Sequence, residues 1–179
     1  MTAMPRATTD PDDPGASRRR LLGYGFTVFL SSALLLVLEI VAGRLIDPYV
    51  GVSLYTWTSI IGTILAGLSV GNWIGGVWAD RGGDDRSVGL VLGLGGALCI
   101  LSLPLLTWLG GAIQGSGLGL LGASFLYAAG LFFAPALLIG VVTPLLTTLA
   151  LRLDPRSGHV VGRMHALAAV GSIAGTFLA

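Results

Sequence analysis

The feature that most constrains the fold of this chain is a series of long apolar segments separated by short polar ones. The first three, at 21–46, 57–79 and 88–109, each supply at least the roughly 20 residues that a helix needs to cross a bilayer core. Two further apolar runs follow, at 118–151 and 164–179. Only 11% of the residues are charged, too few to cover the surface of a soluble domain of 179 residues. We therefore expect an all-α, polytopic transmembrane helical bundle.

The polar segments predict where these helices begin and end. Residues 1–20 are rich in Pro, Asp, Thr and Ala, show no apolar periodicity and close on Arg18, Arg19 and Arg20, which predicts a disordered cytoplasmic tail. Asp47-Pro48 is expected to end the first helix, because proline disfavours helix in the residue before it. The composition of 110–117, Gly-Gly-Ala-Ile-Gln-Gly-Ser-Gly, predicts a loop.

The last two apolar runs have unusual lengths. The run at 118–151 would reach about 50 Å as one helix and contains Pro135 and Pro144. It predicts a kinked or broken helix, or a short external helix leading into a span at 127–151. The run at 164–179 would reach about 24 Å, short of the roughly 30 Å hydrocarbon core. We expect four full spans and a truncated fifth, in a fragment cut within that helix or lacking its natural continuation.

Arginine placement predicts the orientation. Three of the polar segments carry clusters of arginine and should lie on one side of the membrane: Arg18 to Arg20, then Arg81 and Arg86, then Arg152, Arg156 and Arg163. The other side has Arg44 alone. Since cytoplasmic loops are enriched in Arg and Lys, the N-terminus is expected to be cytoplasmic.

Small residues four apart recur in two of the predicted helices. The second span has one such pair and one such triplet, and the fifth has one pair: Gly62 and Ala66; Gly67, Gly71 and Gly75; Gly171 and Gly175. This spacing lets helix backbones approach closely inside a membrane. It predicts helix packing, with a sliding interface as the functional alternative.

A carboxylate stands within the first apolar run. Ser32, Glu39 and Gly43 share one helical face, at i, i+7 and i+11. An ionisable residue at membrane depth normally faces a bundle interior or a water-filled cavity, which makes Glu39 a functional-site hypothesis. The partner of Glu39 is either Arg44 or a group on another helix. Asp47, nearer the end of the first helix, would attract cations to the outer opening of such a site. We take Glu39, Arg44, Asp47 and Ser32 as candidates for a substrate or ion pathway.

The polar hairpin after the second span, G-G-V-W-A-D-R-G-G-D-D-R at 75–86, resembles the cytoplasmic signature of major facilitator superfamily (MFS) transporters. The matching positions are Gly76, Ala79, Asp80, Arg81, Gly83 and Arg86. The helix dipole disfavours an anion at a helix C-terminus, so a cation, Arg86 or Arg152, is expected to hold Asp80. The resemblance implies a cytoplasmic charge latch made by Asp80, Arg81, Arg86 and Arg152. Asp84 and Asp85 stand where the family usually has basic residues, which alters that latch; a solvated turn of mixed charge is the alternative.

Four stretches together resemble the membrane domain of fused transporter-like/spermidine synthase proteins. They are L-E-I-V-A-G-R-L-I-D-P-Y-V-G-V-S-L-Y-T-W-T-S-I-I-G, A-G-L-S-V-G-N-W-I-G-G-V-W-A-D-R, T-P-L-L-T-T-L-A-L-R and G-R-M-H-A-L-A-A-V-G-S-I-A-G-T-F-L. The resemblance implies an MFS-like half-domain in a bacterial inner membrane. Further helices would follow, with a cytoplasmic aminopropyltransferase-like domain that binds decarboxylated S-adenosylmethionine and a diamine.

No catalytic residue of such a domain lies in this chain, which is therefore expected not to be an enzyme, although its parent would be a spermidine synthase-like aminopropyltransferase. The sequence contains no metal-ligand spacing and no phosphate-binding loop, so no metal, cofactor or nucleic acid is expected.

The chain is expected to anchor the missing domain or to move a polyamine-related substrate, with Glu39 binding an ammonium group unless Arg44 neutralises it. The alternatives are a purely structural anchor or oligomerisation module, and a stand-alone small transporter built as a dimer of half-bundles. The expected partners are the lipid bilayer, the further helices with their attached domain, and a second copy in a homo-oligomer.

Overall fold

The computed structural model describes residues 14–114, 117–154 and 156–179, and these form five helices with no strand among them. In chain order they are α1 Pro14–Val50, α2 Leu54–Asp80, α3 Asp85–Gln114, α4 Leu120–Leu153 and α5 Ser157–Leu178. All five are long and apolar enough to cross a membrane. The predicted all-helical fold is confirmed, and the helices are those of a multi-pass membrane protein.

The ends of α1 differ from the prediction. The helix begins at Pro14, inside the segment expected to be disordered, because proline at a first helical position loses no backbone hydrogen bond. Residues 1–13 of that predicted tail lie outside the described residues. At the other end α1 continues past Asp47-Pro48 to Val50, since a proline in the last turn removes only one hydrogen bond. Gly51, with φ +76°, ends it instead.

The later helices also extend beyond their apolar runs. α3 continues through Gly110 to Gln114, so most of the expected loop is helical; residues 115–116 are outside the described part. α4 is one helix with Pro135 and Pro144 inside it, which excludes the separate external helix. α5 begins at Ser157, seven residues before the predicted span, and has 22 residues rather than 16. Polar residues near a membrane surface are compatible with continued helix, so hydropathy alone places the ends too close together.

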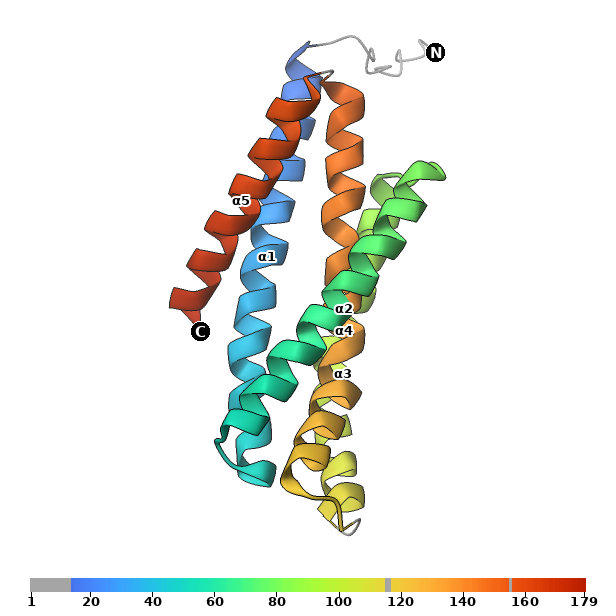
Figure 1. The fold of residues 1–179 in the computed structure, drawn as a ribbon. Helices are drawn as coiled ribbons and strands as arrows, with labels where there is room; N and C mark the ends of the chain where they lie inside the picture. Colours follow the sequence, from blue (N-terminus) through green and yellow to red (C-terminus); the bar gives the residue numbers. More distant parts are fainter. Residues whose placement is uncertain (1–13, 115–116, 155) are drawn as a thin grey trace, which may run out of the picture.

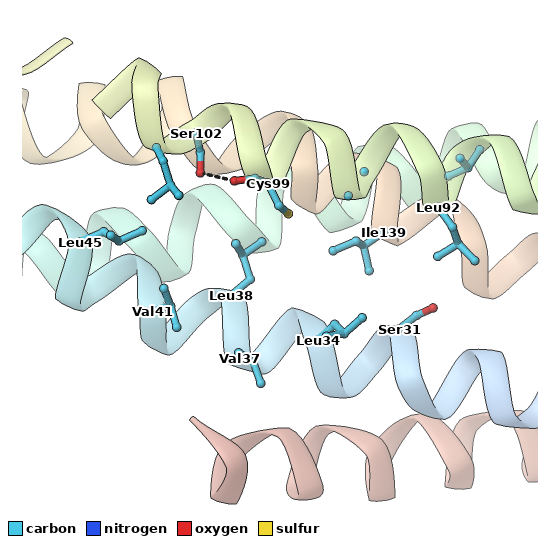
Figure 2. Close-up of a pocket in the computed structure, with 14 residues that line it drawn as sticks. Ser31, Leu34, Val37, Leu38, Val41, Leu45, Leu92, Cys99, Ser102 and Ile139 are labelled. Atoms are coloured by element: carbon cyan, nitrogen blue, oxygen red, sulfur yellow. Dashed lines mark hydrogen bonds between the residues drawn. The ribbon is translucent and has the colours of Figure 1, made fainter. Parts of the chain in front are cut away.

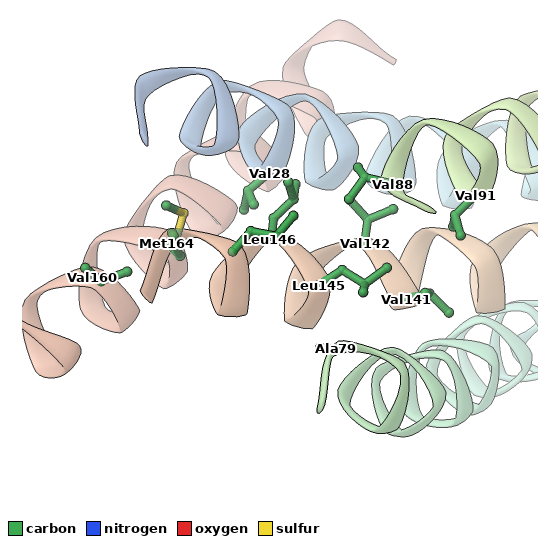
Figure 3. Close-up of a cluster of buried hydrophobic side chains, with 12 residues drawn as sticks. Val28, Ala79, Val88, Val91, Val141, Val142, Leu145, Leu146, Val160 and Met164 are labelled. Carbon is green, nitrogen blue, oxygen red and sulfur yellow. The ribbon is translucent and has the colours of Figure 1, made fainter. Parts of the chain in front are cut away.

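α4 is the central helix of the bundle (Figure 1). Half of its most apolar window is buried, against 22–33% for the other four helices. Near its C-terminal end, side chains from all five helices form one apolar cluster, in which Val28 of α1 and Val88 of α3 meet Leu146 and Val142 of α4 (Figure 3). A second cluster, around Tyr127 and Phe132, joins α4 to α1, α2 and α3 near the opposite end. α2 and α3 are therefore positioned mainly by their contact with α4, whereas α1 packs on both α4 and α5.

α5 packs on α1, and it does so through glycines. A Cβ added at Gly171 or Gly175 would collide with the backbone of Phe29 or Ala33. The order of these contacts shows that α5 runs parallel to α1. The predicted stripe in α5 is thus a helix-packing surface.

α2 packs on α4 in the same parallel manner. Gly67, Gly71 and Gly75 contact successive turns of α4, where a Cβ at Gly67 would lie 2.8 Å from the Phe133 carbonyl oxygen. Gly62 and Ala66 differ from the prediction, because both are exposed and a Cβ at Gly62 would have nothing within 4 Å. The second span has two small-residue stripes, and only the triplet faces a helix of the described chain.

Candidate functional site

Glu39 lies on a side of α1 that neither neighbouring helix covers. Phe29 and Ala33 face α5, whereas Leu35 and Ala42 are buried in the cluster with α4. Successive residues of an α-helix are rotated by 100° about its axis. The Glu39 side chain therefore projects between the α5 direction and the α4 direction, about 40–60° from Leu35 and Ala42. Ser32 projects in nearly the same direction two turns earlier, as the sequence predicted. Both side chains are partly buried.

Two threonines of α4 lie on the matching side of that helix. Leu137, Gly140 and Val141 face α2, so Thr143 and Thr147 project between the α2 side and the α1 side. Val28 of α1 packs with Leu146 of α4 (Figure 3). Because α1 and α4 are antiparallel, Ser32, one turn after Val28, lies at about the level of Thr143. We call Ser32, Glu39, Thr143 and Thr147 the polar face. By these directions it lies between the α1–α5 pair and the α2–α4 pair, which are the two parallel pairs.

Glu39 has no hydrogen bond or ion pair with any residue of the described part of the chain. The pairing with Arg44 that the sequence left open is absent there: Arg44 is exposed and makes no such contact either. Arg44 and Asp47 instead line a small cleft of about 90 Å³ with Thr56 and Trp57, and Glu39 does not line this cleft. Gly43, on the same helical face as Glu39, is covered by α2, because a Cβ there would lie 2.9 Å from Cη2 of the Trp57 ring.

A larger groove, of about 420 Å³, lies between α1 and α3 (Figure 2). Its lining is apolar apart from Ser31, Cys99 and Ser102, and the Ser102 hydroxyl donates to the Cys99 carbonyl oxygen at 2.7 Å. Glu39 and Ser32 do not line it. No charged residue lines this groove.

At the other end of α1, the α2–α3 hairpin is held by Arg152 of α4. Its Nη1 donates to the Gly83 carbonyl oxygen at 3.2 Å and its Nη2 to that of Ala79 at 3.1 Å. This differs from the expected latch, in which Arg86 or Arg152 holds the Asp80 carboxylate. Asp80 is exposed and unpaired among the described residues. The end of a helix presents several unsatisfied carbonyl oxygens with partial negative charge, and these compete with a single carboxylate for the guanidinium.

Asp85, one of the two hairpin residues that differ from the MFS signature, makes a contact that motif comparison did not indicate. The Tyr24 hydroxyl of α1 donates to Asp85 at 2.7 Å, and Arg20 lines the same pocket. The arginines at the start of α1, in the hairpin and around the end of α4 therefore lie at one end of the bundle, and Arg44 lies at the other. At the opposite end, Ser53 caps α2 by accepting from the Thr56 amide at 3.1 Å. Only the serine before an apolar run signals that cap in the sequence.

Asp84 caps α3. The carboxylate accepts from the Ser87 hydroxyl at 2.8 Å and from the Ser87 amide at 3.0 Å. These hydrogen bonds favour the ionised form and lower the pKa of Asp84 below its usual value.

We expect the first turn of α3 to lose protection in acid because of this cap. A lowered folded-state pKa means that the stabilisation is present above the unfolded pKa, about 3.9, and is lost as pH falls through the folded value. Amide exchange at Ser87 should therefore accelerate below about pH 4, beyond the intrinsic pH dependence of exchange. Asp84→Asn keeps a capping oxygen without the titration, so an unchanged pH profile in that variant would contradict the assignment.

Comparisons with known proteins match the chain to no family model, no curated protein and no solved structure.

Proposed function

We propose that this chain is a transporter-like membrane domain whose polar face contacts a cationic, polyamine-related substrate through Glu39. The observation that carries the proposal is the Glu39 carboxylate itself. It is partly buried within an apolar helix, it lies on the side of α1 left open by α4 and α5, and no described residue pairs with it. A carboxylate in such surroundings binds an ammonium group more strongly than one in water.

The packing of the helices supports an MFS-like arrangement. The helices are related by a pseudo-symmetry in which α1 corresponds to α4 and α2 corresponds to α5. The α2–α4 pair then corresponds to the α5–α1 pair. Both pairs are parallel and both are packed through glycines. Since α1 and α4 run in opposite directions, this relation is that of an inverted repeat, the organisation found within each half of MFS transporters. The polar face lies on the two helices that the relation exchanges.

The arginines support an N-terminus on the cytoplasmic side of a bacterial inner membrane. Arg20 and Arg152 lie at the end of the bundle that carries Asp85 and Gly83, and Arg44 lies at the opposite end. The excess of arginine marks the first end as cytoplasmic. An aminopropyltransferase-like domain, implied by the resemblance, would be anchored on that side and would carry the enzymatic activity of the parent protein.

Glu39→Gln is expected to weaken spermidine binding at least about ten-fold, because it removes one charge-assisted contact in a poorly hydrated site. The measurement is equilibrium binding of radiolabelled spermidine to the purified chain in lipid nanodiscs. Asp80→Asn is the matched control, since it also removes one carboxylate but at the exposed end of α2.

Equal spermidine binding by wild type and Glu39→Gln would show that Glu39 does not contact the substrate. Absence of spermidine binding to a folded wild-type chain would favour the purely structural anchor.

A further inference from the structure

The last turns of α2 carry a surface groove that the proposed function does not use. It has a volume of about 500 Å³ and is lined by Trp73, Ile74, Val77, Trp78 and Arg81. Trp73 is 72% exposed and Ile74 37% exposed. The lining residues belong to α2 or, in the case of Arg81, cap its C-terminal end, and none of them belongs to the polar face.

The Arg81 guanidinium is not engaged by the described part of the chain. Its backbone amide bonds the Val77 and Trp78 carbonyl oxygens, so the residue caps α2 without fixing its side chain. The side chain is exposed and has no hydrogen bond or ion pair with a described residue. Asp80 projects about 100° away around the helix and does not line the groove. This differs from Arg152, whose guanidinium is already bonded to two carbonyl oxygens.

The depth of these residues suits a lipid headgroup. α2 has 27 residues. It is therefore about 40 Å long, roughly 5 Å longer at each end than a hydrocarbon core of about 30 Å. Arg81 and Trp78 then lie at headgroup level, whereas Trp73 and Ile74 lie about 5 Å inside the hydrocarbon. Tryptophan prefers this interface, and the arginine fork matches a phosphate.

We propose that this groove binds an anionic phospholipid, with its phosphate on the Arg81 guanidinium and the first carbons of an acyl chain along Trp73, Ile74 and Val77. The one charge in the groove is positive and complements the headgroup. The apolar wall complements the acyl chain and offers nothing to a free phosphate. The site is independent of Glu39 and of the transport proposal.

The test uses fluorescence quenching by brominated lipids. A Trp57→Phe/Trp108→Phe background leaves Trp73 and Trp78 as the only tryptophans, and the protein is reconstituted with brominated phosphatidylglycerol or brominated phosphatidylcholine at equal mole fraction. We expect phosphatidylglycerol to quench more strongly, with a relative association constant about five-fold higher, and Arg81→Gln to abolish that preference. Arg86→Gln is the matched control: it removes one exposed arginine from the same end, outside the groove.

Equal quenching by the two lipids, or a preference that survives Arg81→Gln, would overturn the proposal. So would equal loss in Arg86→Gln, which would indicate general attraction to the membrane surface. Displacement by inorganic phosphate would show a free-anion site instead. A second measurement avoids the double-phenylalanine background: native mass spectrometry should find fewer phosphatidylglycerol molecules retained by the Arg81→Gln protein than by wild type, and equal retention counts against the site.

Discussion

Replacing Gly71 with alanine is expected to destabilise the protein by about 2 kcal/mol or more, whereas the same change at Gly62 should be neutral or stabilising. A Cβ at Gly71 would collide with the Leu137 carbonyl oxygen and lie 3.1 Å from Cα of Gly140. These are backbone atoms, which cannot move aside as a flexible side chain could. At Gly62 a Cβ meets nothing within 4 Å, so only the helix-favouring effect of alanine, up to about 1 kcal/mol, remains.

The measurement is equilibrium unfolding of both variants in mixed micelles of increasing dodecyl sulfate content, followed by circular dichroism. Both substitutions add one methyl group to the same helix, so the difference between them isolates the α2–α4 contact. Equal effects at the two positions would contradict the packing of α2 on α4 through its Gly67–Gly71–Gly75 stripe.

Replacing Arg152 with methionine is expected to destabilise the protein by about 1–2 kcal/mol and to loosen the α2–α3 hairpin. The variant loses both donors to the Ala79 and Gly83 carbonyl oxygens while keeping most of the side-chain volume. Charged donors stabilise such bonds more than neutral ones, although solvent exposure of Arg152 reduces their effect.

Hydrogen exchange measured by mass spectrometry on the hairpin peptide checks this expectation. Arg156→Met is the control, because it removes the same charge from an exposed position just before α5, at the same end of the bundle. Arg152→Lys keeps the charge with one compact donor group and should fall between wild type and Arg152→Met. Unchanged exchange in Arg152→Met, or an equal change in Arg156→Met, would contradict the role assigned to Arg152.

The number and approximate positions of the spans could be predicted because hydropathy is a local property. Helix ends could not, since they depend on backbone hydrogen bonds that apolar composition does not report. The continuation of α1 through Pro48, and the start of α5 at Ser157, are examples. Pro135 and Pro144 could be located as irregularities, but only the structure showed that α4 continues through both.

The hairpin shows a different limit of motif comparison. The resemblance pointed to Asp80 as the centre of a latch, yet the contacts that hold the hairpin are those of Arg152 with backbone carbonyls and of Tyr24 with Asp85. Backbone acceptors have no residue identity in a sequence, so no motif could have indicated them. Tyr24 and Asp85 are 61 positions apart; Tyr24 lies outside the motif, and Asp85 is one of the two positions that depart from it.

By itself, the sequence determined that the chain is a helical membrane bundle, that small residues four apart line faces of the second and fifth helices, and that Glu39 and Ser32 share one side of a helix. These follow from periodicity within a single helix. The tertiary structure alone decided that the two glycine stripes face α4 and α1, that Gly62 and Ala66 face no helix of the described chain, and that Glu39 remains unpaired between the two parallel helix pairs. The reason is physical: helical spacing defines a face, but which partner covers that face depends on how the five helices pack against one another.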